Sequence, residues 1–261
     1  MTVQDALLSV RDLRVSLRGR TLASLPQLDL GAGECVSIVG ESGSGKTTSL
    51  MTVLGLNRGT GLDCEGDVSL FGVDPLTASD TRLRSIRGRR VSLIMQSPQS
   101  ALNPTLKLGT MLMRVLGAHG VSKSEAQTRL KAAFASVRLR DELADSYPHQ
   151  VSGGQAQRFA IALALALGSQ MIAADEPTSA LDMTVQAEIT ALLRELCADR
   201  GLGLLLVSHD LALVSTLADR VIVMKDGAVV DSDETVRVLT RPSSEYTVEL
   251  INAGLALGGG A

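Results

Sequence analysis

The chain has 261 residues, of which 45% are hydrophobic, and this length and apolar content suffice for a large buried core. They exclude a chain that is disordered throughout. A net charge of −3 provides no long-range attraction for nucleic acid, so we expect no nucleic acid partner. The longest apolar run covers residues 159–167, far short of the roughly 20 residues of a membrane-spanning helix.

The sequence pattern of the first third of the chain predicts strands before and after one glycine-rich loop. Residues 7–17 alternate apolar and polar side chains, as a half-buried strand does. Residues 34–39 form a β-rich run that enters the loop, and residues 47–56 continue from it as a helix. Residues 68–71 and 91–95 predict two further strands.

The pattern becomes helical after residue 96 and returns to strands after residue 168. The expected helices of the middle region are residues 110–116, 124–137 and 155–167. The later strands are expected at residues 171–174, 203–207, 221–224 and 228–230, with helices at 184–198 and 211–217 between them. Lys225-Asp226-Gly227 predicts a tight hairpin. Such alternation predicts an α/β fold with a mainly parallel sheet flanked by helices.

The glycine-rich loop matches the phosphate-binding P-loop pattern in full. It consists of Gly40, Glu41, Ser42, Gly43, Ser44, Gly45, Lys46 and Thr47. Its position after a strand and before a helix is the context that this motif requires, which disfavours a chance Gly/Ser-rich loop. Backbone N–H groups would converge on phosphate oxygens, Lys46 would reach the β- and γ-phosphates, and Thr47 would offer a hydroxyl to Mg²⁺. We expect Thr48 to bind ATP together with this loop.

A second candidate element is the apolar run of residues 171–174, which ends in Asp175 and Glu176. Ligands bind at the carboxyl ends of strands in open α/β sheets. We expect Asp175 to bind Mg²⁺ through water and Glu176 to polarise the attacking water. Many buried strands end in a purely structural acidic residue, so the pairing with the P-loop is what favours a catalytic role.

Between these two elements, Val151 precedes Ser152, Gly153, Gly154 and Gln155, a run that resembles the signature of ATP-binding cassette (ABC) proteins. Alone this run could be a simple helix cap. Three further motifs resemble those of the family: Gln96 its Q-loop, residues 179–182 with Asp182 its D-loop, and His209 its switch histidine. A lone histidine after a strand is otherwise usually structural.

The resemblance implies the P-loop NTPase fold of ABC ATPases, with an N-terminal antiparallel β region and an inserted helical subdomain. We expect one domain over residues 1–261. Its nucleotide-binding core would comprise residues 1–96 and 169–240, its helical signature subdomain residues 97–168, and its short C-terminal tail residues 241–261. The glycines at 258–260 are expected to fray.

The resemblance also implies a mechanism in which two ATPase subunits pair head to tail with ATP and Mg²⁺ between them. Ser152 and Gly154 would then touch the γ-phosphate of ATP bound to the partner. His209 would hold the γ-phosphate and the water in its own subunit, and Thr47, Gln96 and Asp175 would bind the metal. With Glu176 also present, the chain is expected to hydrolyse ATP rather than only sense it.

Two positions depart from the family pattern. The aromatic residue that stacks on adenine has no counterpart, because Leu17 occupies its place, and base stacking is therefore weakened. The leucine that opens the signature is Val151, a change of small volume.

The segments 96–104 and 147–150 resemble the ATPases of dipeptide, oligopeptide and nickel importers, as does the region of Glu245-Tyr246-Thr247. In that branch a different second ATPase subunit, two transmembrane permeases and an external solute-binding protein complete the transporter. The chain would act at the cytoplasmic face of the cell membrane as a peripheral subunit. Residues 96–113 are expected to form the groove for a permease helix, the alternative being a solvated loop. The alternative function is an ABC ATPase that acts on nucleic acid or ribosomes.

Overall fold

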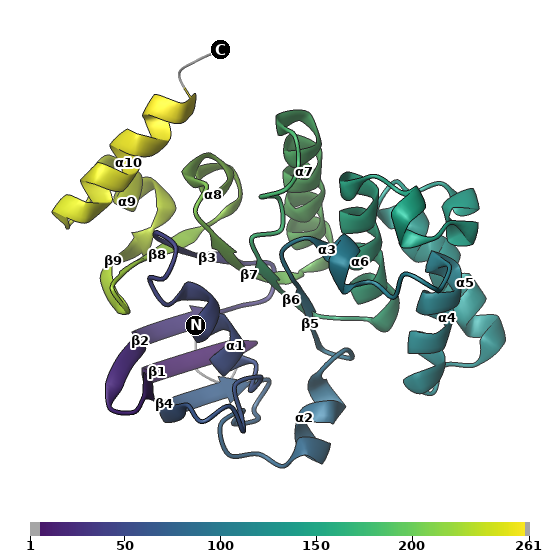
Figure 1. The fold of residues 1–261 in the computed structure, drawn as a ribbon, viewed down its shortest axis with the longest axis horizontal. Helices are drawn as coiled ribbons and strands as arrows, with labels where there is room; N and C mark the ends of the chain where they lie inside the picture. The colour runs from purple at the N-terminus through teal and green to yellow at the C-terminus, as the bar shows by residue number, and fades with distance from the viewer. Residues whose placement is uncertain (1–5, 259–261) are drawn as a thin grey trace.

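A nine-stranded sheet, in the order β4-β1-β2-β9-β8-β3-β7-β6-β5, organises the chain (Figure 1). This computed structural model describes residues 6–258, with side chains through residue 253. The sheet has an antiparallel part and a parallel part. It is an α/β arrangement with helices against the sheet, as expected from the sequence.

The antiparallel part comes from the N-terminal region. Its strands are β1 (Leu8–Leu17), β2 (Arg20–Leu30) and β4 (Asp63–Leu70), and β1 pairs with both of the others. The alternating pattern predicted β1. The sequence analysis named no strand for residues 20–30, because Pro26 and several polar residues obscure the alternation there.

The parallel part forms the centre of the sheet. Its strands are β3 (Cys35–Val39), β5 (Val91–Ile94), β6 (Met171–Asp175), β7 (Gly203–Ser208) and β8 (Arg220–Lys225). The last strand, β9 (Ala228–Glu234), pairs antiparallel with β8 through the expected hairpin. Asp226 and Gly227 at this turn have φ values of 48° and 79°, the left-handed conformation that a tight hairpin requires.

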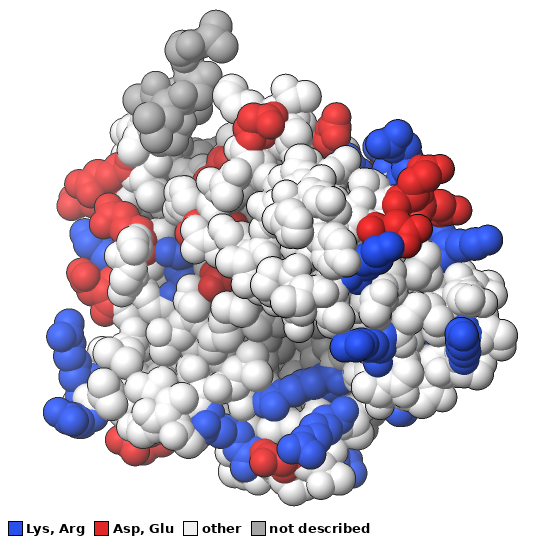
Figure 2. All heavy atoms as spheres, turned by 45° about the vertical axis from the view of Figure 1, so that its right-hand side comes forward, with Lys and Arg blue, Asp and Glu red and all other residues white. Residues whose placement is uncertain are grey.

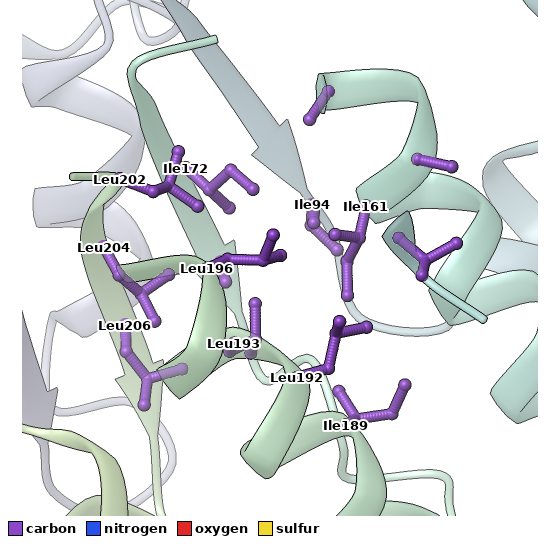
Figure 3. Packing of buried hydrophobic residues seen from close by; sticks show 14 of the residues in the cluster. Ile94, Ile161, Ile172, Ile189, Leu192, Leu193, Leu196, Leu202, Leu204 and Leu206 are labelled. Atoms are coloured by element: carbon purple, nitrogen blue, oxygen red, sulfur yellow. The ribbon is translucent and has the colours of Figure 1, made fainter. Parts of the chain in front are cut away.

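Side chains on the central strands alternate between two buried clusters. Leu204 and Leu206 of β7 face one cluster, and Leu205 and Val207 face the other. Figure 3 shows Leu204 and Leu206 turned toward Leu193 of a covering helix, with Ile94 of β5 and Ile161 of another helix close together in the same layer. Both faces of the central strands are therefore covered, which explains their nearly continuous apolar sequence.

Helices occupy residues 98–167, where the sequence predicted them. They are α3 (Pro98–Ala101), α4 (Leu108–Ala118), α5 (Lys123–Ser136) and α6 (Gly153–Leu167), with short 3-10 turns at Asp141–Asp145 and Pro148–Gln150. Phe134 and Phe159 pack edge to face at 6.1 Å between α5 and α6. This group lies to one side of the sheet (Figure 1).

The remaining helices are α1 (Lys46–Val53), α2 (Asp80–Ile86), α7 (Met183–Arg200), α8 (Leu211–Leu217), α9 (Thr235–Thr240) and α10 (Glu245–Gly258). The sequence analysis did not predict α2 or α9, which are short. Within residues 6–258, none of the helices combines the length and apolarity needed to cross a bilayer.

Much of the expected C-terminal tail region, residues 241–261, is helical in the described part of the chain. Residues 245–258 form a helix that packs against α8 and β9, because its first turn buries the ring of Tyr246. Gly258 ends this helix, whereas the expected fraying of Gly259 and Gly260 concerns residues outside the described part of the chain.

Candidate active site

The P-loop joins β3 to α1, and its backbone passes very close to neighbouring strands. A Cβ atom on Gly40 would lie 2.1 Å from the carbonyl oxygen of Met224. A Cβ atom on Gly45 would lie 2.7 Å from the carbonyl oxygen of Leu22, and Gly45 also has a φ of 98°. Only glycine fits at these two positions. The loop backbone therefore lies packed against these strands at the N-terminus of α1, a position that favours anion binding.

Lys46 is the first residue of α1 and lies beneath this loop. Its Nζ donates hydrogen bonds to the carbonyl oxygens of Gly40 and Glu41, both at 2.7 Å. Burial lowers the pKa of Lys46, and the nearby carboxylates of Glu176 and Asp175 oppose this effect. The ammonium group is thus held against the loop before any phosphate is bound.

Asp175 ends β6 opposite the start of α1. The hydroxyl of Thr47 donates to Asp175 Oδ1 at 3.1 Å, and the whole Asp175 residue is only 8% exposed. Burial raises the pKa of Asp175, and the neighbouring Glu176 acts in the same direction. The bond from Thr47 and the charge of Lys46 lower the pKa but do not cancel this effect. A carboxylate and a hydroxyl at this spacing are ligands that Mg²⁺ accepts.

Glu176 and His209 form a pair across the ends of β6 and β7. His209 Nδ1 lies 2.8 Å from Glu176 Oε1, so Nδ1 carries the hydrogen when Glu176 is ionised. Glu176 has a φ of 48°, and its N–H donates to the carbonyl oxygen of Val207 at 2.8 Å. A non-glycine residue in this conformation is strained by about 1 kcal/mol or more, and such strain is common at functional sites. The Val207 bond stabilises the strained backbone.

These groups surround one open cavity of about 660 Å³. Its lining residues are Leu22, Glu41, Ser42, Gly43, Gly45, Lys46, Thr47, Thr48, Gln96, Asp175, Glu176 and His209. Nearly all the expected P-loop, metal and catalytic residues are thus brought together, and Gly40 and Ser44 shape the loop behind the lining. Gln96 reaches the site from the end of β5, where its Nε2 donates to Ser179 Oγ at 3.1 Å.

Two features at the rim concern recognition of the base. Leu22 lines the cavity although nothing in the local sequence pattern marks it as a site residue. None of the lining residues is Phe, Tyr or Trp. Leu17, at the expected adenine position, is 40% exposed at the end of β1. The cavity therefore supplies polar groups for phosphates but no aromatic face for a base.

The signature residues are not among those that line this cavity. Ser152 caps α6 by accepting a hydrogen bond from Gln155 N at 3.2 Å, and Gln155 Oε1 accepts one from Ser152 N at 2.9 Å. The helix-cap interpretation of these residues is therefore correct as a local description. A Cβ atom on Gly154 would lie 2.4 Å from Val185 of α7, and one on Gly153 would lie 3.1 Å from Leu181. The signature thus packs against the start of α7.

The D-loop residue Asp182 also has a structural role in this position. It caps α7, accepting a hydrogen bond from Val185 N at 2.9 Å. Asp182 does not line the cavity around Lys46 either. Neither the signature residues nor Asp182 therefore line the cavity around Lys46 of their own subunit.

A second hollow of about 400 Å³ lies between the sheet and the helical region, and its lining is mostly apolar. It is lined by Leu54, Leu56, residues 87–88, residues 91–95, Pro98, Ala101, Leu102, Ala160, Leu163, Ala164 and Leu167. The start of the segment 96–113, which was expected to form a permease groove, supplies part of this lining. A groove needs two walls, and α6 and the end of α1 supply the others, while Met113 lines a separate hollow with α5.

The segment that leads into one wall of this groove is rich in arginine, a feature that was not predicted to belong to a site. Five arginines fall within residues 82–90. Arg87 lines the groove, and its guanidinium donates to the carbonyl oxygens of Leu54 and Gly55 at 2.8 and 2.6 Å. Figure 2 shows the surface hollowed between two lobes, with Lys and Arg side chains gathered on the lower lobe.

The site fits MgATP on its own geometry. The close-packed glycines leave room for phosphate but not for side chains, Lys46 is available as a cation, and Thr47 and Asp175 present oxygen atoms side by side. The hydroxyl of Ser44 is buried in the loop without a hydrogen-bond partner of its own. A polyanionic ligand with a divalent cation matches this set of groups.

Comparison with known proteins gives one consistent result. A family model described as "ABC transporter" matches residues 25–179. The probable D,D-dipeptide transport ATP-binding protein DdpD of Escherichia coli is 42% identical over 229 residues, covering 86% of this chain and 70% of that protein. A putative peptide import ATP-binding protein of Brucella ovis is 40% identical, covering 96% of this chain and 79% of that protein.

Other relatives are longer, and solved structures agree with the fold. This chain spans about half the length of the peptidoglycan transport ATP-binding protein YejF of Agrobacterium fabrum, with 39% identity and coverage of 97% and 48%. The dimeric post-hydrolysis structure of the ATP-binding cassette MJ0796 with ADP and Pi superimposes with a TM-score of 0.75 at 30% identity, covering 87% of this chain and 98% of that one. The cbiO1 structure from Clostridium perfringens superimposes with a TM-score of 0.81 at 23% identity, covering 98% of both chains. At this identity the similarity supports the fold alone.

The raised pKa of Asp175 generates a stability prediction. Because the pKa is higher in the folded than in the unfolded chain, ionisation of Asp175 destabilises the fold as pH rises through the folded pKa. Asp175→Asn keeps an acceptor for Thr47 and removes the charge. We expect it to raise the melting temperature of the nucleotide-free chain at pH 7 by about 2 °C, with the gain shrinking in acid.

Calorimetric melting across pH checks this expectation, with the exposed Asp63→Asn as the matched control. A nucleotide-free Asp175→Asn chain that melts below the wild type at pH 7 contradicts it.

Proposed function

The chain belongs to the ABC transporter family, and from that premise we propose that it is the ATP-hydrolysing subunit of an importer that takes up peptides. The observation that carries this proposal is a complete set of hydrolytic groups around one cavity, in a chain about 40% identical to proteins named for peptide import. Nickel or a metal chelate is the alternative cargo, because the branch that the sequence resembles includes both kinds. The transporter would hold the chain at the cytoplasmic face of the cell membrane.

The proposed roles follow from position. The amides of residues 42–48 and the ammonium of Lys46 bind the phosphate oxygens, and Thr47, Gln96 and Asp175 hold Mg²⁺ directly or through water. When bound, Mg²⁺ neutralises charge on the β- and γ-phosphates. Glu176 accepts the hydrogen bond of the attacking water, and His209, bonded to Glu176 at 2.8 Å, fixes the carboxylate and faces the γ-phosphate. Positioning and charge stabilisation account for the rate.

A second ATPase subunit is part of this proposal. The signature at Ser152 and the P-loop at Lys46 belong to separate surfaces of one subunit, since only the latter lines the cavity. Head-to-tail pairing lets the signature of each subunit close the cavity of the other. Ser152 Oγ already accepts a bond from Gln155 N, which leaves its hydroxyl hydrogen free to donate to a phosphate. We propose a related but different ATPase chain as the partner.

The apolar groove is the proposed contact with the permease. Leu56 and Met95 on its walls are 40% and 46% exposed, which is unusual for large apolar side chains beside a hollow. Met95 precedes Gln96, so one wall of the groove is continuous with the hydrolytic cavity. A short permease helix seated there would move with the Q-loop. Two permeases would each use one such groove of the ATPase pair.

Replacing the proposed base separates binding from turnover. Glu176→Gln keeps the size and the hydrogen-bonding oxygen but removes the negative charge. We expect MgATP to bind with near-normal affinity, the closed pair to accumulate, and phosphate release to fall by about 100-fold or more. Steady-state phosphate release and gel filtration with ATP measure these two effects.

The exposed Glu142→Gln is the matched control, because Glu142 lies outside the cavity. Near-normal phosphate release from Glu176→Gln would contradict the role assigned to Glu176.

Cargo and direction are tested in the assembled transporter. The chain is reconstituted in lipid with its partner ATPase and permeases, and binding proteins loaded with peptide or with nickel chelate are added on the opposite side. We expect peptide-loaded binding protein to stimulate ATP hydrolysis and to drive peptide uptake, since cargo selection occurs outside the ATPase.

If only the binding protein loaded with nickel chelate stimulated ATP hydrolysis, the cargo would be nickel chelate and the chain would still be an importer subunit. Hydrolysis that ignores the membrane components and responds to nucleic acid or ribosomes would overturn the transporter proposal.

A charge placed in the groove tests its role. Leu56→Glu puts a carboxylate where a permease helix would have to bury it, and such burial without a partner costs several kcal/mol. We expect uptake to fall by about tenfold or more, while the isolated chain keeps its ATPase activity. Val236→Glu, at a 73% exposed position on α9, is the matched control. Parallel loss of uptake and of isolated ATPase activity would show that Leu56 is only structural.

A further inference from the structure

The C-terminal helix reaches the P-loop through a single phenol. The N–H of Glu41 donates a hydrogen bond to the hydroxyl oxygen of Tyr246 at 3.0 Å, although the two residues are 205 positions apart in the sequence. Tyr246 lies in the first turn of α10 and is 7% exposed. The resemblance of residues 245–247 to importer ATPases assigns Tyr246 no role at the site.

The bond to Glu41 continues to the phosphate-binding lysine. Glu41 donates its N–H to Tyr246, and its carbonyl oxygen accepts a 2.7 Å hydrogen bond from Lys46 Nζ. Displacing Glu41 therefore moves one of the two carbonyls that hold Lys46. Tyr246 thus acts on the cavity through Glu41 and Lys46, without lining the cavity itself.

The phenol is itself fixed from several sides. Lys225 Nζ lies 4.6 Å from the centre of the Tyr246 ring, a cation–π contact from the end of β8. Just before α10, the N–H of Ser243 donates to Asp231 of β9 at 2.8 Å. Ser244 Oγ then accepts from Thr247 N at 3.1 Å, in the manner of a helix cap. The start of α10 is therefore anchored to the sheet, and Tyr246 is held in one orientation.

A second tether comes from the same region of the chain. The N–H of Gly227, in the β8–β9 hairpin, donates to the carbonyl oxygen of Ser44 at 3.2 Å. The P-loop is thus held at Glu41 by α10 and at Ser44 by the hairpin. The Tyr246 bond is the one made by a side chain, so a substitution can remove it without altering the backbone.

We propose that Tyr246 is a positioning residue for ATP binding, whose hydroxyl holds the P-loop and Lys46 in the phosphate-binding arrangement and makes α10 part of the nucleotide site. The inference rests on ATP binding alone and does not depend on the cargo, the direction of transport or the permease groove. Failure of the peptide-import proposal therefore leaves it unaffected.

The kinetic consequence follows from where the phosphates are held. The P-loop and Lys46 contact the phosphates both in bound ATP and in the transition state. Loss of such uniform binding raises KM and leaves kcat nearly unchanged. A residue that only supports the fold would instead lower thermal stability without this separation of KM from kcat.

Tyr246→Phe is the decisive variant, because it keeps the ring beneath Lys225 and removes only the hydroxyl. We expect the Kd for MgATP, measured by calorimetry on the purified full chain, to rise about fivefold, the effect of one net hydrogen bond. In the assembled transporter, KM for ATP should rise by a similar factor with kcat within about twofold of wild type. The melting temperature of the nucleotide-free chain should fall by no more than about 4 °C, the effect of one lost hydrogen bond.

Val248→Ala on the same helix is the matched control, since the Val248 side chain is 42% exposed whereas Tyr246 is 7% exposed. It should leave both the Kd and the KM unchanged. Wild-type affinity in Tyr246→Phe would overturn the proposal. An equal loss of affinity in Val248→Ala would overturn it in favour of a structural role for α10. So would a loss in Tyr246→Phe that comes with a fall in melting temperature much larger than about 4 °C, the effect of one hydrogen bond.

Discussion

The parallel pairing of β3, β7 and β6 is the constraint on which the rest of the site depends. In parallel neighbours the carboxyl ends of the strands meet at one edge of the sheet. β3 delivers the P-loop to that edge, β6 delivers Asp175 and Glu176, and β7 delivers His209. Residues 40, 176 and 209 are far apart in sequence, and the backbone ladder brings them together without any loop having to fold over the others.

Burial of charge at this edge is costly, and local bonds offset part of that cost. Lys46 is held by two carbonyl oxygens, Asp175 accepts from Thr47, and Glu176 pairs with His209. The pKa of Asp175 nevertheless remains raised by burial, and Glu176 keeps a strained backbone. Buried charges that destabilise the nucleotide-free site increase the free energy gained on binding Mg²⁺ and phosphates, because the charges of these ligands complement those of the site.

The two apolar clusters on either side of the sheet separate the tasks of the molecule. One cluster joins the central strands to α4, α5, α6, α7 and α8, and the other joins them to α1 and the N-terminal strands. The cavity around Lys46 opens at the end of the sheet, and the apolar groove opens between α1 and α6. Gln96 links them, since it lines the cavity while its neighbour Met95 lines the groove. Movement of this one segment therefore affects both surfaces.

The sequence by itself determined the α/β class, the P-loop, the acidic pair at the end of β6 and the histidine after β7, because these depend on local periodicity and on residues at fixed spacing. It could not reveal the strand β2, whose alternation is interrupted, or the short helices α2 and α9. Only the tertiary structure decided that Leu22 borders the cavity, that α6 supplies a wall of the groove, and that Tyr246 bonds to Glu41 across 205 residues. Such contacts join segments that are remote along the chain, and no local pattern of side chains encodes which remote segment will lie against which.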